Sequence, residues 1–435
     1  MNALFWHRRD LRIDDNTALF HGLKDNTSLL PIFIFDSEIL NGLKSDDQRI
    51  IFIHQEIKKL KEEYQIYSSD LLVYNGRPEE IIPKLMLELN IDSLYFNKDY
   101  EPYAIKRDKT IEKKIYELNK SVFSYKDHVI FEENEVLKND NTPFLVYTYY
   151  AKNWIENLTN SPIESLNTSS FIQNLKKINP KNRTLLPPLE TFGFSAKQKV
   201  VFPEKKIDLQ CLENYYKERD FPALQATSRL GVHLRFGTLS IRKVVKLALN
   251  YDVFLKELIW REFYQMLIYH FPHSAQFAFK KLYEQIEWNY DEQKINQWMT
   301  GQTGFPIVDA GMRELNETCF MHNRVRMITA SFFCKNLGMD WRIGERYFAN
   351  KLLDYDLASN VGSWQWVAGI GCDAAPYFRV FNPELQQQKF DPNFAYIKKW
   401  VPEWNSDLYP TPIVDLKTSK EEILAKFKKV LKQKG

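Results

Sequence analysis

The sequence has few cysteines, and nothing in their arrangement suggests a metal site. Only four occur in 435 residues. They form no C-x-x-C pair, and no histidine stands at the spacing of a zinc ligand. We therefore expect neither a disulfide framework nor a bound metal, and free thiols favour a reducing, cytoplasmic location. The four residues are Cys211, Cys319, Cys334 and Cys372.

Long apolar runs and a strong net charge are also missing. No stretch approaches the roughly 18 apolar residues of a membrane-spanning helix. The N-terminal sequence MNALFWHRRDLR becomes charged too early for a secretory signal. We therefore expect a protein that is neither exported nor bound to a membrane. The net charge of +3 is small, so any nucleic-acid binding would need a local basic patch.

Several common catalytic motifs are absent. Without G-x-G-x-x-G after the first strand, and without a Walker A sequence, a dinucleotide bound in the Rossmann manner is not expected. No Ser-His-Asp order or nucleophile elbow is present. Asp354 and Asp356 would diverge on a helix, which disfavours the paired carboxylates of a glycosidase. His233 and His322 lack a partner at ligand spacing, so we interpret both as packed or hydrogen-bonded residues.

Aromatic residues, in contrast, are abundant, and the length implies more than one domain. Phe, Trp and Tyr make up 14% of the chain, with 10 Trp and 23 Tyr. Core packing accounts for most of them, but such a content also suits stacking on planar ligands. A chain of 435 residues exceeds a single core, which predicts two domains and a connector.

The first 130 residues alternate β-rich runs with helical ones, which predicts a Rossmann-like α/β domain with a parallel sheet. Strands are expected at ALFWH, LLPIFIFD, DLLVYNG, SLYFNKD and SVFSYKD, and helices within residues 46–64, 78–90 and 101–119. Residues 131–195 are rich in Asn, Ser, Thr and Pro, which indicates an interdomain connector. The remainder is almost wholly helical. We therefore predict domains at 1–130, 131–195 and 196–435, the last all-α.

The segment DYDLASNVGSWQW, which ends at Trp366, is typical of a ligand site rather than a core. On a helix, Trp364 and Trp366 would face opposite sides, so one ring can point inward and the other toward a partner. Asp356 and Asn360 lie one turn apart and can hydrogen-bond the edge of a heterocycle. Capping within the core explains these two polar residues equally well.

Two further helical segments carry polar and aromatic residues on one face. LKELIWREFYQML places Glu257, Trp260, Arg261 and Tyr264 at i, i+3, i+4 and i+7. CFMHNRVRMITASFF likewise places three residues on one face of a helix, Asn323, Arg326 and Met327. Arg326 and Asp354 form the most natural ion pair among the helices, because each lies in an apolar segment.

The stretch TSRLGVHLRFGTLS begins with two hydroxyl residues, Thr227 and Ser228, followed by Arg229. Hydroxyls and free backbone N–H groups at a helix start bind anions, and the arginine adds a positive charge, so the stretch can hold a diphosphate. A plain N-cap is the alternative interpretation.

Together these residues resemble the DNA photolyase and cryptochrome family. WHRRDLRIDDN, TSRL, ELIWREFY, TGFPIVDAGMREL, FMHNRVRMITASFF, DWRIGERYF and DYDLASNVGSWQW follow in the family's order, from residue 2 to about residue 400. The resemblance implies FAD in the helical domain and an α/β domain able to carry a second, light-harvesting chromophore. That antenna would be methenyltetrahydrofolate, a deazaflavin or a flavin, although related pockets can also stay empty. Glu101 matches a position that contacts a folate.

The resemblance also implies roles for individual residues. The FAD phosphates would be held by Tyr215, Thr227, Ser228, Arg229, Leu230 and Gly231, although many members have Ser in place of Gly231. The flavin and ribose would be contacted by Arg326, Asp354, Tyr355, Asp356 and Asn360, with Asn360 at the flavin N5. An electron path to the surface would run through Trp364, Trp341 and Trp288.

Within the family, the chain is most similar to class I cyclobutane pyrimidine dimer photolyases. Members that act on 6-4 photoproducts carry a histidine where Asn323 stands, and the DASH branch usually has Tyr where Trp366 stands. A flipped-out dimer would be met by Glu257, Trp260, Asn323, Met327 and Trp366, with Asn360 on the flavin side. The DNA around the lesion would be contacted by Arg261, Tyr264, Arg324, Arg379, Gln386 and Lys389. The expected partner is therefore damaged DNA, bound by a monomer.

Two other functions remain open. A blue-light photoreceptor of the cryptochrome type would keep FAD and the tryptophan path without repairing DNA. A light-independent flavoprotein oxidoreductase would need a nicotinamide site, which nothing in the sequence resembles. Restoration of dimer-containing DNA under visible light would distinguish repair from both.

Overall fold

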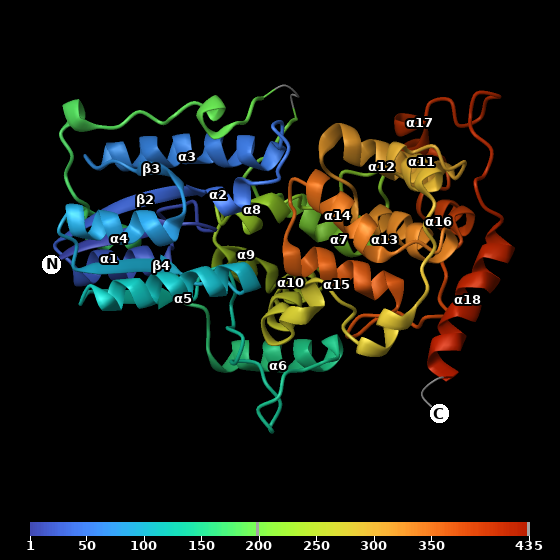
Figure 1. Cartoon of the computed structure of the whole chain (residues 1–435), viewed down its shortest axis with the longest axis horizontal. Coiled ribbons are helices and arrows are strands. Elements are labelled where there is room, and N and C mark those ends of the chain that lie inside the picture. Colours follow the sequence, from blue (N-terminus) through green and yellow to red (C-terminus); the bar gives the residue numbers. More distant parts are fainter. Residues whose placement is uncertain (197–199, 433–435) are drawn as a thin grey trace. The chain divides into compact units, whose positions relative to one another are not determined.

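The structure, a computed structural model, describes residues 1–196 and 200–432 and divides the chain into two compact units (Figure 1). The α/β unit contains Met1–Thr142, Lys152–Ile207 and Arg229–Glu262. The helical unit contains Pro143–Ala151, Asp208–Ser228 and Phe263–Gly435. The sequence predicts three consecutive blocks, whereas the segments of the two units alternate along the chain.

The α/β unit is built on a five-stranded parallel sheet with the strand order β3-β2-β1-β4-β5. The strands are β1 (Asn2–His7), β2 (Ser28–Asp36), β3 (Leu72–Gly76), β4 (Ser93–Asn97) and β5 (Ser121–Tyr125). All five predicted strands are confirmed. They form because β1, β2 and β4 are near-continuous apolar runs, which suit a parallel sheet covered on both faces.

Helices cover both faces of this sheet. They are α1 (Thr17–Asp25), α2 (Ser37–Leu40), α3 (Gln48–Ile66), α4 (Pro78–Glu88) and α5 (Pro102–Glu117). Leu4 and Trp6 of β1 pack in one buried cluster with side chains of α4 and α5, and α3 lies on the opposite side in Figure 1. The three predicted helices are confirmed. The sequence missed α1, which begins where Asn16 accepts a hydrogen bond from the Leu19 N–H at 3.2 Å.

The region predicted to be a connector is more ordered than its composition indicates. It contains the 14-residue helix α6 (Tyr147–Asn160), followed by short 3-10 turns such as Thr168–Asn174. Trp154 of α6 is buried, 1% exposed. The Asn, Ser and Thr content obscured a helix that tertiary packing stabilises.

The rest of the chain is helical, as predicted. The helices are α7 (Leu209–Glu218), α8 (Gly231–Arg235), α9 (Ile241–Ala248), α10 (Asp252–His270), α11 (Glu292–Thr300), α12 (Pro306–Thr318), α13 (Asn323–Ser331), α14 (Trp341–Lys351), α15 (Leu357–Ala368), α16 (Pro383–Phe390), α17 (Ala395–Trp400) and α18 (Leu416–Lys432). Helices α8 and α9 and the first part of α10 belong to the α/β unit. The core of the helical unit includes Trp298, Phe333 and Trp364. Within residues 1–196 and 200–432, no helix is long and apolar enough to cross a membrane.

Candidate functional site

Helix α15 begins at Leu357, so the first residues of the polar segment lie before the helix. Asp354 lies before the helix, and Asp356 is its N-cap, where Oδ1 accepts a hydrogen bond from the Ser359 N–H at 3.0 Å. The sequence predicted that the two carboxylates diverge on a helix, and this is wrong in detail. Asp354 projects from a loop and Asp356 from the start of the helix. Asn360 follows one turn later and is 9% exposed.

The ion pair expected between Arg326 and Asp354 is present. Arg326 Nη2 lies 3.0 Å from Asp354 Oδ2, and Arg326 Nε donates to the backbone oxygen of Met321 at 2.7 Å. The side chains of the pair are 24% and 20% exposed. Because this ion pair is anchored to the backbone and is still partly exposed, it can contact a ligand as well as stabilise the fold.

Asp356 has a partner that the sequence did not identify. Gln265 of α10 donates through Nε2 to both carboxylate oxygens, at 3.0 Å each. Gln265 Oε1 is buried and has no hydrogen-bond partner among the described residues. An unsatisfied buried acceptor is costly, so this atom is suited to a donor on a bound molecule.

Asn360 is oriented by a second carboxylate that the sequence missed. Its Nδ2 donates to Glu345 Oε1 at 2.8 Å and to the Glu345 backbone oxygen at 3.2 Å. Burial raises the pKa of Glu345, against the hydrogen bond from Asn360, which lowers it. With its amide nitrogen held this way, the carbonyl oxygen of Asn360 is the atom that could accept a hydrogen bond from a ligand.

These residues together fit the polar edge of FAD. The pairs Arg326–Asp354, Gln265–Asp356 and Asn360–Glu345 all lie in the helical unit. Their side chains include both hydrogen-bond donors and acceptors, which a flavin ring needs, and the unsatisfied Gln265 oxygen can accept from a donor on the bound group. Tyr355, between the two aspartates, is half-buried.

The expected phosphate stretch has an unusual backbone. Arg229 adopts a left-handed conformation with φ of 50°, which costs about 1 kcal/mol or more for a residue other than glycine. Helix α8 begins at Gly231, after Leu230 as N-cap without a side-chain hydrogen bond. Neither Thr227 nor Ser228 is therefore the N-cap, so the plain-cap alternative does not describe them. Strain of this kind is found where a backbone is shaped for a ligand.

Trp364 and Trp366 differ in environment in the way that the sequence predicts. Trp364 is 2% exposed, and an added Cβ on Gly344 would lie 2.2 Å from its ring, so α14 and α15 meet there at the glycine. Trp366 is half-buried. Trp341 is 1% exposed, and Trp288 packs against the same core.

A buried tryptophan outside the predicted path also contacts Trp364. Trp298 is fully buried, and its ring centroid lies 6.2 Å from that of Trp364 in an edge-on arrangement. Its Nε1 donates to the Thr329 backbone oxygen at 3.1 Å. The hydrogen bond indicates a structural role, and the residue offers a control for the predicted path.

The side chains predicted to contact DNA from the helical unit form a small basic cluster. Arg324 lies 4.3 Å above the ring of Phe390, and the exposed Lys389 lies 5.2 Å from the same ring. Arg324 also pairs with Asp220 at 2.8 Å and reaches the Met327 sulfur at 3.8 Å. The cluster therefore joins a predicted pocket residue to two predicted DNA contacts.

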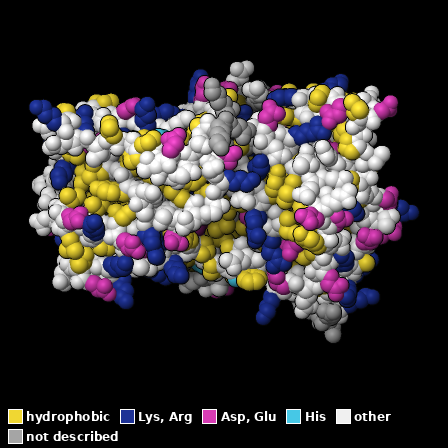
Figure 2. Space-filling view, turned by 45° about the horizontal axis from the view of Figure 1, so that its top comes forward, with side chains coloured by type: hydrophobic (Ala, Val, Ile, Leu, Met, Phe, Trp, Pro, Cys, Tyr) yellow, Lys and Arg dark blue, Asp and Glu magenta, His cyan; other side chains and the backbone are white. Residues whose placement is uncertain are grey.

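The other predicted DNA contacts are more dispersed. Arg379 is exposed, Gln386 half-buried and Asn323 exposed. On the face shown in Figure 2, basic and acidic side chains are interspersed. On this face, DNA binding would therefore depend on local clusters rather than on one large positive field.

Helix α10 carries the polar and aromatic stripe predicted for LKELIWREFYQML. Glu257, Trp260, Arg261 and Tyr264 are each half-buried, as expected for a face that is neither core nor open surface. Arg261, which is predicted to contact DNA, already donates through Nη1 to the His128 backbone oxygen at 2.7 Å. Fewer of its donors are left for a DNA phosphate.

Glu262, which the sequence analysis did not single out, anchors this helix within the α/β unit. Its carboxylate accepts hydrogen bonds from the backbone N–H groups of Ile130 at 2.6 Å and Phe131 at 2.9 Å, and from Trp154 Nε1 at 2.5 Å. Burial raises the pKa of Glu262 to about 7, although all three hydrogen bonds lower it. A charged residue on the apolar side of α10 was the available signal.

The two histidines have structural partners, as predicted. His233 Nδ1 is 2.8 Å from the Thr238 hydroxyl and Nε2 is 3.0 Å from the Pro203 backbone oxygen. His322 is the N-cap of α13, where Nδ1 accepts from the Arg324 N–H at 3.1 Å. Burial lowers the pKa of His322 to about 4, so it is neutral near pH 7.

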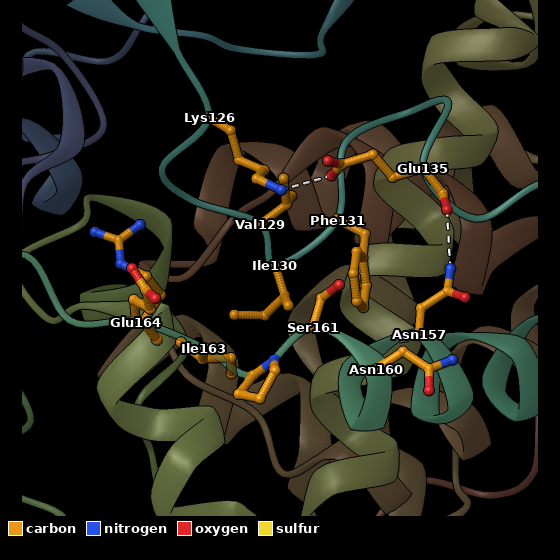
Figure 3. A pocket seen from close by; sticks show the side chains of 12 residues that line it. Lys126, Val129, Ile130, Phe131, Glu135, Asn157, Asn160, Ser161, Ile163 and Glu164 are labelled. Carbon is orange, nitrogen blue, oxygen red and sulfur yellow. Dashed lines mark hydrogen bonds and ion pairs between the residues drawn. The ribbon is translucent and has the colours of Figure 1, made fainter.

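The residue expected to contact a folate is held by arginines. Glu101 Oε1 lies 2.9 Å from Arg9 Nη1 and 3.5 Å from Arg235 Nη2. Elsewhere in the α/β unit, a cavity of about 480 Å³ is lined by Lys126, Phe131, Glu135 and Asn157 among others (Figure 3). Lys126 pairs with Glu135 at 2.6 Å, so these two charges of the cavity neutralise each other.

Comparison with known proteins gives one consistent result. Residues 3–168 match the family described as DNA photolyase, and residues 254–408 match the FAD binding domain of DNA photolyase. A deoxyribodipyrimidine photo-lyase of Synechococcus sp. is 35% identical over 426 residues, which cover 92% of this chain and 87% of the relative.

Solved structures agree. A bacterial class III photolyase from Agrobacterium tumefaciens superposes with a TM-score of 0.85 at 30% identity, covering 99% of this chain and 98% of the neighbour. An archaeal photolyase from Sulfolobus tokodaii superposes with a TM-score of 0.83 at 31% identity, covering 99% and 100%. That structure is described as holding two FAD molecules, with the implication of a novel light-harvesting cofactor.

Proposed function

We propose, from the premise that this chain belongs to the DNA photolyase family and contains its FAD-binding domain, that it repairs cyclobutane pyrimidine dimers in DNA with light. When bound, FAD in its reduced and light-excited form supplies one electron to the dimer and takes it back after the ring opens. The name of the Synechococcus relative supports dimer repair.

The observation that carries the proposal is that one helix and its N-cap bring together four of the predicted functional residues. Within twelve residues, α15 has the capping Asp356, the oriented Asn360, the buried Trp364 and the half-buried Trp366. A rigid helix keeps such groups in fixed relation. Cofactor contact, electron supply and substrate contact would thus be held in register.

The substrate is a dimer flipped out of the duplex. A damaged pair stacks poorly, so extrusion costs less than for a normal base. Trp260 and Trp366 would provide flat walls and Met327 an apolar floor, while Glu257 and Asn323 would hydrogen-bond the pyrimidine edges. Asn323, where 6-4 enzymes have histidine, favours cyclobutane dimers and the class I assignment.

The flanking DNA would be held by charge. Arg324, Arg379 and Lys389 would neutralise phosphates and Gln386 would add a polar contact, which positions the strand without reading sequence. Arg324 would exchange its pairing with Asp220 for a phosphate. Because the basic residues are few, binding should depend on salt with a modest slope.

Trp364, Trp341 and Trp288 would return oxidised flavin to its active state. The burial of Trp364 and Trp341 keeps their rings apart from water, while the half-buried Trp288 can exchange electrons with a reductant in solution. This path is needed only to activate the enzyme, not in each repair cycle.

The test uses purified protein with chemically reduced FAD and an oligonucleotide that contains one cyclobutane dimer. Repair under blue or near-ultraviolet light and none in darkness is expected. A matched oligonucleotide with a 6-4 photoproduct should stay unrepaired. No repair of either lesion, together with light-dependent reduction of FAD in a parallel sample that starts oxidised, would instead identify a cryptochrome-type photoreceptor.

A further inference from the structure

Lys335 is a buried cation that the proposed function does not yet use. It is 1% exposed and lies in a short π-helix, Phe332–Asn336, which follows α13. Its Nζ donates to the backbone oxygen of Tyr377 at 3.1 Å, and it forms no ion pair with any residue of 1–196 or 200–432. A buried ammonium without a carboxylate is costly to the fold, and π-helices are frequent at functional sites. We therefore expect this charge to have a function.

The ammonium group lies against an aromatic cluster that includes Trp288. Its Nζ is 4.0 Å from the ring centroid of Phe427 of α18. The ring of Trp288 meets the same Phe427 ring edge-on, with 6.2 Å between the centroids and 83° between the planes. Tyr377 stacks on Phe427 at a centroid distance of 5.5 Å. Lys335 and Trp288 therefore contact the same aromatic ring.

The π-helix and the turn after it also hold the two ends of the proposed electron path. Phe333, two residues before Lys335, packs edge-on against Trp364 with 6.1 Å between the ring centroids. After the π-helix, the backbone oxygen of Gly338 accepts from the N–H of Asn289, the neighbour of Trp288, at 2.7 Å. The side chain of Asn289 donates to the Leu337 backbone oxygen at 2.9 Å. The position of Lys335 beside Trp288 is therefore fixed by packing.

The other titratable groups around this cluster are neutral or paired. Burial raises the pKa of the Cys334 thiol and of Tyr283, so both stay uncharged near pH 7. The charged neighbours pair with one another, Asp340 and Glu284 with Arg342 and Glu287 with Lys429, while Lys426 donates to the Glu287 backbone oxygen. Burial lowers the pKa of Lys335 itself to about 7, so its charge changes near neutral pH.

We propose that the charge of Lys335 controls the supply of electrons through Trp288. When Trp288 gives one electron toward Trp341, its ring is left with one positive charge, and a thiol or similar reductant in solution later restores that electron. The ammonium form of Lys335 repels the positive charge, which keeps the missing electron on the inner tryptophans, where it is refilled sooner from the flavin side. The neutral amine lets the charge reach Trp288. The inference rests on the proposed function, in which Trp288 is the outer end of the path.

Flash photolysis of the FAD-loaded protein, with the flavin initially oxidised and a thiol present, measures the lifetime of the oxidised tryptophan and the yield of flavin reduction. Lys335→Met is the main variant, because it is similar in size and removes an unpaired buried charge. We expect its yield to exceed that of the natural chain on the order of threefold to tenfold at pH 6, with a longer lifetime, and to equal it at pH 8.5. A ratio of yields that is the same at both pH values would overturn the proposal.

Two further variants separate the charge from other effects. Lys335→Gln is neutral but can still donate to the Tyr377 backbone oxygen, so it should behave like Lys335→Met. If it behaves like the natural chain, the hydrogen bond and not the charge is responsible, and the proposal is wrong. Lys429→Met removes an exposed charge next to Glu287, which water already screens, and should keep the natural pH dependence. An equal gain in this control would remove the assignment to Lys335.

Urea unfolding gives a measurement that needs neither light nor electron transfer. A lysine whose folded pKa is lowered costs stability in full below that pKa, and the cost declines as pH rises toward the unfolded value of 10.5. The stability of the natural chain relative to Lys335→Met should therefore be constant below about pH 7 and rise between pH 7 and pH 9. No rise would show that Lys335 stays charged, and would overturn its control by pH.

Trp288→Phe distinguishes failure of this inference from failure of the path. Unchanged photoreduction in that variant would refute the path and, with it, the role of Lys335. Lower photoreduction in Trp288→Phe, without any effect of the Lys335 variants, would refute the role of Lys335 alone. Repair by chemically reduced protein does not use the path, so it tests the proposed function separately.

Discussion

Glu262 makes the local stability of the α/β unit dependent on pH in a direction opposite to that of most carboxylates. Its pKa rises from 4.5 to about 7 because burial outweighs three hydrogen bonds. An acid with a raised pKa stabilises the folded state below its unfolded value of 4.5, and that contribution is lost as pH rises through about 7. At 1.36 kcal/mol per pKa unit, the loss is about 3 kcal/mol.

The Glu262→Gln variant removes the titration, because a neutral amide has nearly the same shape as the protonated acid. Its NH2 group cannot accept from one of the N–H donors that the two carboxyl oxygens meet, and that loss is the same at every pH. We expect the stability of the variant relative to the natural chain to rise by about 3 kcal/mol between pH 4.5 and pH values above 7. All other titrating groups are common to the two proteins and cancel in the comparison.

Hydrogen exchange of a peptide covering residues 128–133 provides the assay, because the Ile130 and Phe131 amides donate to this carboxylate. The ratio of protection between variant and natural chain at the same pH should rise by a factor on the order of 10² from pH 5 to pH 8. A ratio that falls between pH 5 and pH 8 would mean that the hydrogen bonds outweigh burial, and the reasoning would be wrong.

Three further predictions concern light and DNA. Trp364→Phe should abolish photoreduction of oxidised flavin but spare repair by chemically reduced protein, whereas the matched control Trp298→Phe should retain both activities. Transient and steady-state absorption measure the photoreduction. Failure of repair in Trp364→Phe with FAD bound would contradict the separate roles of photoreduction and repair. Lys389→Ala should weaken DNA binding and lower the slope of log affinity against log salt by about one; an unchanged slope in a fluorescence-anisotropy titration would remove Lys389 from the interface. Trp366→Ala should lose discrimination between damaged and undamaged DNA, and an unaltered affinity ratio would exclude its ring from the pocket.

The sequence predicted the architecture better than the local partners within the site. Strands β1, β2 and β4 are long apolar runs, so their period and boundaries identify them directly. Helix α1 was missed because it has only nine residues, too few for a clear helical period. Helix α6 was missed because its stability comes from burial of residues such as Trp154, which composition does not reveal.

In the candidate site, the sequence identified the residues that belong to recognisable motifs. It did not identify the residues that hydrogen-bond to them and hold them in place. The Arg326–Asp354 pair followed from two charges in apolar segments. Gln265, Glu345 and Glu262 escaped because each acts through a partner distant in sequence, 91, 15 and 108 to 132 positions away. Such pairings exist only once the chain is folded, and spacing alone cannot reveal them.

The central claim is that one electron leaves reduced FAD, opens the dimer and returns. The most direct measurement counts dimers repaired per chain under light, without oxygen or added reductant. The Trp364→Phe variant is used so that no new reduction can occur. Many dimers repaired per chain, with the flavin spectrum unchanged, is the predicted result. Repair that stops at one dimer per chain, with the flavin left one electron short of its fully reduced form, would show that the electron does not return and would contradict the account.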